Sequence, residues 1–210
     1  MITLATETRS TTTRATALAN PIEFHARVEP VATDAFRPEW LATLARIPGD
    51  GLKGAGFPRN VLGTIAYNPE TFGPFLEFWV TCKSSFALTV REQELVILRM
   101  ACLYRSNYVW KHHVLVGHEF GVTEPELDAI RDGDFARFAS PRERALLALT
   151  DELVDARSIR AHAYGAHAHE LSRKELVDLV SLVSQYVFFA LMNNAFQVEV
   201  EAPLAGVRGL

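Results

Sequence analysis

Cysteine is scarce in this sequence: its 210 residues include only Cys82 and Cys102. The two lie far apart among apolar residues, so neither a C-x-x-C redox pair nor a disulfide framework is indicated. This usage favours a cytoplasmic protein whose thiols are reduced and buried.

Long apolar runs and clusters of positive charge are also missing. The longest apolar run, Val187–Met192, is too short to cross a bilayer and is flanked by Gln185 and Asn193. Lys and Arg total 21 against 25 Asp and Glu, and the arginines are scattered. We therefore expect neither a membrane nor a nucleic-acid partner, because phosphate binding needs a concentrated positive face.

Alternation of apolar and polar residues is rare as well, and its best stretch, residues 25–29, is short. Helix starts are frequent instead. Four segments show the capping-box pattern, in which a Ser or Thr and a Glu three residues later satisfy free amide groups. They begin at Thr89, Thr123, Ser140 and Ser172, and Asn68-Pro69 is a fifth start of similar logic. The sequence therefore predicts an all-α protein.

The predicted organisation is one helical domain, residues 31–210, preceded by an arm, residues 1–30, that is flexible or wraps a neighbouring subunit. The helix that follows Ser172 is nearly apolar all round toward its end, so we expect it to be the central helix. Two earlier helices are expected at Pro38–Ile47 and Pro69–Phe86. A glycine-rich loop, residues 49–58, is expected to lie between them and to be able to line a site.

Residues 91–121 are the most informative segment and read REQELVILRMACLYRSNYVWKHHVLVGHEFG. They predict two helices with a break near residues 105–107. Ser106, Val109 and His113 recur at three- and four-residue spacing on the second helix, so they share one face. Gly121 is suited to end that helix.

The spacing in this segment resembles a motif of the carboxymuconolactone decarboxylase and alkylhydroperoxidase D-like superfamily. The matching positions are Glu94, Ser106, Val109, His113 and Gly121. In peroxidase members, cysteines of a C-x-x-C pair stand where Ser106 and Val109 stand here. Tyr108-x-Trp110-x-x-His113 resembles the variant found in members without that pair. The resemblance extends from about residue 79 to residue 200 and implies a helical bundle of the alkylhydroperoxidase D-like type.

The missing cysteine pair argues against peroxide reduction by the family's route, which needs a low-pKa thiolate and a resolving thiol. The resemblance then implies a cofactor-free acid–base enzyme: a decarboxylase, lyase or isomerase acting on a small carbonyl, carboxylated or lactone metabolite. It further implies a homo-oligomer, as a dimer, trimer or hexamer, and no metal is required.

His113 is the expected general acid/base, because imidazole exchanges a proton near neutral pH. Glu94 would orient or polarise it, or handle a proton itself, while Ser106 would supply a hydroxyl and Tyr108 a phenolic proton. The expected substrate-binding residues are Trp110, Val109 and Trp79. Trp110 would form an apolar wall for flat ligands.

Each assignment has a structural alternative. Glu94 could instead pair with Arg91 or Arg99, Ser106 could be only a small residue at a helix break, and His113 could be a core histidine. A further prediction concerns residues expected at the surface. These are His112 and His118, the solvated turn with His162, His167 and His169, and an exposed helix face with Arg142, Arg144, Asp151 and Glu152.

Two other functions remain open at this point. A non-catalytic oligomeric protein could use the same pocket to bind a small molecule. A residual thiol peroxidase would require Cys82 and Cys102 to lie within disulfide reach.

Overall fold

The computed structural model describes residues 26–47 and 57–210, and within these ranges it contains helices and no strands. The expected all-α fold is confirmed. Most of the predicted arm and most of the glycine-rich loop, residues 1–25 and 48–56, lie outside the described residues. The helices are α1 (Pro38–Leu44), α2 (Arg59–Ile65), α3 (Pro69–Ser85), α4 (Val90–Leu103), α5 (Asn107–Glu119), α6 (Glu124–Asp132), α7 (Pro141–Ala156), α8 (Ala161–His167) and α9 (Arg173–Phe196).

The predicted helix starts are confirmed. Thr89, Thr123 and Ser172 each form a complete capping box at the start of α4, α6 and α9. Ser140 caps α7 by accepting the amide of Glu143, and Asn68 caps α3 in the same way. These starts are local features, because the capping side chain and its partner amide lie within one turn.

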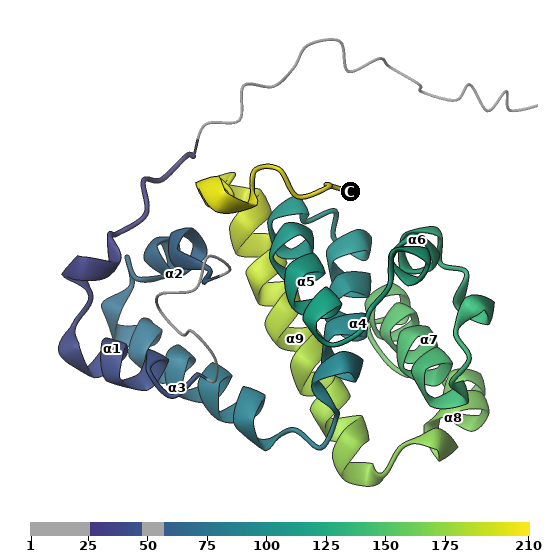
Figure 1. Ribbon diagram of the computed structural model, residues 1–210. Helices are drawn as coiled ribbons and strands as arrows, with labels where there is room; N and C mark the ends of the chain where they lie inside the picture. Colours follow the sequence, from purple (N-terminus) through teal and green to yellow (C-terminus); the bar gives the residue numbers. More distant parts are fainter. Residues whose placement is uncertain (1–25, 48–56) are drawn as a thin grey trace, which may run out of the picture.

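Helix α9 packs against α2, α3, α4, α5 and α7, as a central helix does, but α4 is the more completely buried of the two. Nine of the fourteen residues of α4 are buried, against nine of twenty-four in α9. In Figure 1, α4 lies between α5, α7 and α9, and it also contacts α6. Helix α9 is less buried than its composition suggests because it keeps an apolar stripe on its solvent face, formed by Val177, Val180, Phe188 and Leu191.

By length and composition, α9 alone among the described helices could cross a bilayer, since its most apolar window has a mean hydropathy of 1.5. The core helix of a globular protein can have the same properties. In this fold α9 packs along α4, and the polar side chains of Asp178, Gln185 and Asn193 are buried within the protein. We therefore treat α9 as a helix of the bundle.

The break between α4 and α5 lies where it was expected. Arg105 adopts a left-handed conformation with φ of 51°, and Ser106 is the N-cap of α5. At the other end of α5, Gly121 has φ of 81°, the positive value that a glycine tolerates best just past a helix. The two helices therefore fold back on each other, which brings Glu94 of α4 near His113 of α5.

Two short helices, α2 and α8, were not predicted. Helix α2 follows the glycine-rich loop, and α8 replaces the predicted solvated turn. His162 and His169 are exposed as expected, and His167 is partly buried. Within residues 26–47 and 57–210, no three His, Cys, Asp or Glu side chains gather where they could hold a metal ion.

Of the charges predicted to form an exposed face on α7, Arg142, Asp151 and Glu152 instead join elements together. Arg144 is half-buried and donates to the carbonyls of Phe138 and Ala139, just before α7. Arg142 binds Glu92 of α4 at 2.5 Å and Glu175 of α9 at 2.6 Å. Asp151 binds Arg99 of α4 at 2.6 Å, and Glu152 is buried beside Arg160. That prediction was wrong because α7 packs against α4, so its polar residues meet partners on neighbouring helices.

This network predicts a specific acid sensitivity. Hydrogen bonds from Arg142, and then from the Ser172 backbone, lower the pKa of Glu175 to about 2. A lowered folded-state pKa gives stability that is present above the ordinary value of 4.5 and is lost as the pH falls toward 2. We expect the melting temperature to fall across this range. In Arg142→Met the fall should be shallower, and an equal slope in both proteins would contradict the assignment.

Candidate active site

Glu94 and His113 form a buried pair between α4 and α5. Glu94 Oε2 lies 2.6 Å from His113 Nδ1. The side chain of Glu94 is 2% exposed and that of His113 is 14% exposed. The alternative partners of Glu94 are excluded, since Arg91 binds Glu126 and Glu143 while Arg99 binds Asp151. The predicted relation between the histidine and the carboxylate is therefore present.

Tyr186 of α9 completes this group, and the sequence analysis did not identify it. Its hydroxyl lies 3.0 Å from His113 Nε2, and the two rings meet edge to face with centroids 5.1 Å apart. The signal that could have revealed it is a tyrosine on the buried face of an apolar helix, because a buried phenol needs a hydrogen-bond partner. Nothing in the sequence names that partner.

The hydrogen bonds fix the orientation of the His113 ring. A buried phenolic O–H requires an acceptor, and His113 Nε2 is the acceptor that the described residues offer it. In the tautomer that carries its hydrogen on Nδ1, His113 donates to Glu94 and accepts from Tyr186. The chain from Glu94 through His113 to Tyr186 thus gives both ring nitrogens a partner.

Tyr186 remains a proton donor over a wide pH range. Burial raises its pKa well above the ordinary value of a phenol, and the nearby charge of Glu94 raises it further. The phenol therefore stays protonated while it contacts Nε2. An O–H held in this way can stabilise negative charge that develops on an oxygen atom.

Tyr108 lies in a second buried cluster and not beside His113. Its hydroxyl donates to Glu201 Oε1 at 2.7 Å, and Glu201 Oε2 lies 2.6 Å from His112 Nε2. The Asn60 amide also donates to Glu201 Oε1, at 2.9 Å. Tyr108 and His112 are one turn apart and share a face of α5, whereas His113 is rotated by about 100° from His112. The structure therefore does not bring Tyr108 to the first group.

His112 was predicted to face solvent or an interface, and that prediction was wrong. Its side chain is buried against Glu201, which lies in the segment after α9. Burial raises the pKa of Glu201, but hydrogen bonds from His112, Asn60 and Tyr108 and the His112 charge outweigh burial and lower it overall. The second cluster thus fastens the segment after α9 to α5 and to the start of α2.

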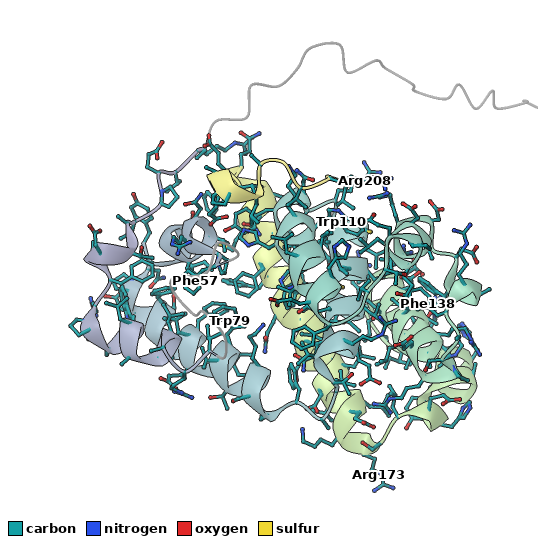
Figure 2. The ribbon with its side chains drawn as sticks, viewed as in Figure 1. Phe57, Trp79, Trp110, Phe138, Arg173 and Arg208 are labelled. Carbon is teal, nitrogen blue, oxygen red and sulfur yellow. The ribbon has the colours of Figure 1, made fainter. Side chains whose placement is uncertain are left out.

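Trp110 also faces away from His113. Its indole N–H donates to the carbonyl of Arg208 at 3.0 Å, and the Arg131 guanidinium lies 4.9 Å from the centre of its ring. Figure 2 shows Trp110 beside Arg208, near the end of the chain. A shallow hollow there is lined by Trp110, Val114, Glu124, Leu127, Arg131 and Arg208. The predicted wall at Trp110 therefore belongs to a different region of the surface.

Trp79 is connected to His113 through two aromatic rings. It meets Phe189 of α9 edge to face at 5.5 Å, and Phe189 lies 5.6 Å from Tyr186. Val109 is buried one turn before His113 on α5, and Ser106 is buried at the N-cap of that helix. The contacts thus join Glu94, His113 and Trp79 along one seam between α3, α4, α5 and α9. Helical spacing puts Val109 and Ser106 on the face of α5 that carries His113.

The two thiols have different surroundings, and neither is activated. Burial raises the pKa of Cys82, which lies near Gln185 and Asp178 of α9. Burial raises the pKa of Cys102 to about 11, despite the nearby charges of Arg99 and Arg131. A peroxidatic cysteine needs the opposite shift, because the thiolate is the nucleophile. The environments of both thiols therefore disfavour a relocated thiol peroxidase.

Comparison with known proteins links this arrangement to one family. Residues 69–152, from the start of α3 to near the end of α7, match the sequence model of the carboxymuconolactone decarboxylase family. This range begins earlier and ends earlier than the expected resemblance, but it includes the whole Glu94–Gly121 motif. No curated protein matches the chain in sequence.

Several solved structures share the fold. One is an uncharacterized peroxidase-related protein with an alkylhydroperoxidase AhpD core from Ralstonia eutropha JMP134. It has 18% identity and a TM-score of 0.70, and the match covers 89% of this chain and 96% of that one. The debrominase Bmp8 has 16% identity and a TM-score of 0.68, with 84% and 93% covered.

A protein of unknown function from Agrobacterium tumefaciens, ATU0492, is a third structure with this fold. It has 19% identity and a TM-score of 0.59, and the match covers 65% of this chain and 94% of that one. A variant of Bmp8 has been solved in complex with 2,3,4-tribromopyrrole. At identities of 16–19%, these three proteins support the fold alone. The chemistry of this chain therefore has to follow from its own site.

Proposed function

We propose that this chain, whose residues 69–152 match the model of the carboxymuconolactone decarboxylase family, is a cofactor-free enzyme that moves protons on a small carbonyl or lactone metabolite. The observation that carries this proposal is the chain of contacts Glu94–His113–Tyr186. Such a group combines an oriented base with a neutral hydrogen-bond donor. Its catalytic residues are His113 and Tyr186, and Glu94 is a positioning residue.

The geometry suggests how the step proceeds. A substrate that enters between Tyr186 and His113 displaces their hydrogen bond, which frees Nε2 to accept a proton from the carbon next to a carbonyl. The C–H electron pair moves into the carbonyl, and the enolate oxygen accepts the Tyr186 O–H. Nε2 then returns the proton to another carbon of the conjugated system. Glu94 stabilises the imidazolium that exists between the two transfers.

Decarboxylation would use the second half of the same sequence. Loss of CO2 from a β-keto-like acid leaves its bonding electron pair on the carbonyl system as an enolate. Protonation of the enolate at carbon by an imidazolium completes the reaction, and Tyr186 again donates to the oxygen. Isomerisation is the reaction that we propose first, because it uses His113 for both proton transfers and Tyr186 for the enolate oxygen.

The test follows both reactions with one preparation. α-Angelica lactone, whose double bond is not conjugated with its carbonyl, is converted by this step to the conjugated β-isomer, which is detected by ultraviolet absorbance. CO2 release from carboxymuconolactone is measured in parallel, with His113→Ala beside wild type in both assays. Isomerisation lost in the variant supports the proposal. CO2 release alone would replace isomerisation by decarboxylation, and no turnover of any lactone or β-keto acid would refute an acid–base enzyme of this class.

A further inference from the structure

Four buried side chains, one on α3, one at the start of α5 and two on α9, carry polar atoms that have no hydrogen-bond partner among the described residues. They are Trp79 (Nε1), Ser106 (Oγ), Gln185 (both amide atoms) and Asn193 (both amide atoms). Gln185 does lie beside the Cys82 thiol, which is a weak partner. A buried polar group without a partner is costly, so such a concentration in one region requires a physical reason.

These four side chains belong to the seam that contains the candidate active site. Gln185, Phe189 and Asn193 recur every four residues along α9, and Tyr186 lies on the adjoining part of that face. Trp79 packs on Phe189 from α3, and Figure 2 shows it between α3 and α9. The unpartnered groups therefore lie alongside the ring of Phe189.

Ser106 joins the group at the other end of the seam. Helices α5 and α9 run antiparallel, because His113 meets Tyr186 near one end and Asn194 donates to the Tyr104 carbonyl near the other. Ser106 and Asn193 each neighbour this second contact in the sequence. Both helices therefore contribute a buried polar side chain at this end of their contact.

Glu94 is the acidic side chain that the contacts place in this seam, and it is buried against His113. Both arginines of α4 bind carboxylates on other helices. The ammonium of Lys83 lies 5.9 Å from the centre of the Trp79 ring, and that of Lys174 binds Asp178. A ligand carboxylate would therefore meet Glu94 without a built cationic partner.

We propose that this seam, lined by Trp79, Ser106, Gln185, Phe189 and Asn193, is a binding site for an uncharged, flat ring compound with both a hydrogen-bond donor and an acceptor. Aromatic rings supply stacking surface, and two amides, one hydroxyl and one indole N–H supply the complementary polar contacts. The inference deepens the proposed function, on which it rests, because it makes the substrate neutral and not carboxylated.

Binding of benzamide and benzoate tests the charge preference, because the two have nearly the same shape and differ in charge. We expect calorimetry at neutral pH to show benzamide binding at least tenfold more tightly than benzoate. Equal affinities, tighter binding of benzoate, or no binding of benzamide would overturn the inference. If benzoate binds and Lys83→Gln abolishes that binding, the site is one for anions.

Variants locate the benzamide site. Asn193→Leu and Gln185→Leu should each weaken benzamide binding at least tenfold. Both should keep the melting temperature or raise it, because each removes an unpaired buried amide. Ser184→Ala, an exposed position on the same helix, is the matched control and should bind benzamide like wild type. Unchanged affinity in both leucine variants would place the ligand elsewhere and overturn the inference.

The outcome of the benzamide experiment can be told apart from the outcome of the turnover test of the proposed function. Selective benzamide binding without turnover of any lactone would leave this inference standing and remove the enzyme. Turnover of α-angelica lactone without a preference for benzamide would support the enzyme and overturn this inference.

Discussion

His113→Gln is expected to slow lactone isomerisation by about 10²–10⁴-fold, the range in which a positioned acid–base group contributes. Glutamine can still donate an N–H to Glu94, so the buried carboxylate keeps a partner. It cannot accept and return a proton near neutral pH. Steady-state rates with α-angelica lactone measure the effect, and the melting temperature should stay close to that of wild type.

Two further variants separate catalysis from packing at this site. Tyr186→Phe keeps the ring against His113 and Phe189 and removes only the hydroxyl, so it should lower kcat while the fold persists. Glu94→Gln keeps a hydrogen bond to Nδ1 without its charge, so it should lower kcat and alter the pH profile. If His113→Gln retains the wild-type rate, the imidazole takes no part in the reaction.

Glu201→Ala is expected to destabilise the protein by about 3–5 kcal/mol, the usual cost of breaking a buried charged pair from one side. The change leaves His112, the Tyr108 hydroxyl and the Asn60 amide without the carboxylate that they share. For a chain of this size, each kcal/mol corresponds to about 2–4 °C in melting temperature. Thermal unfolding followed by circular dichroism measures the loss.

The adjacent histidines provide the control for this second prediction. His112→Gln should lower stability with little change in the kcat of whatever protein remains folded, whereas His113→Gln should do the opposite. A Glu201→Ala protein that melts like wild type would show that the second cluster adds nothing to the fold. A loss of kcat in folded His112→Gln would instead connect the two clusters.

The helix starts could be predicted because their causes are local. Thr89 and Glu92 satisfy each other within one turn, so the sequence contains both partners. Which face of a helix is buried depends on distant segments. The composition of α9 indicated a central helix, but nothing in it revealed that Val177 and Leu191 face solvent.

The difference between local and distant contacts also explains which residues of the candidate site could be predicted. Glu94 and His113 could be paired at the sequence level because the family resemblance matches both positions. Tyr186 could not be paired, because it lies 73 residues from His113 and only packing brings it there. Tyr108 was assigned to the wrong neighbour for the same reason, since Glu201 is 93 residues away.

The hydrogen bond between His112 and Glu201 also fixes the register of α9 against α5, and with it the contact between His113 and Tyr186. Helix α5 carries both histidines, and α9 carries Tyr186 and leads into the segment with Glu201. A slip of α9 by one turn, about 5.4 Å, would separate both contacts together and leave His112 and Glu201 buried apart. Only the register that joins His112 to Glu201 therefore sets the phenol of Tyr186 against Nε2.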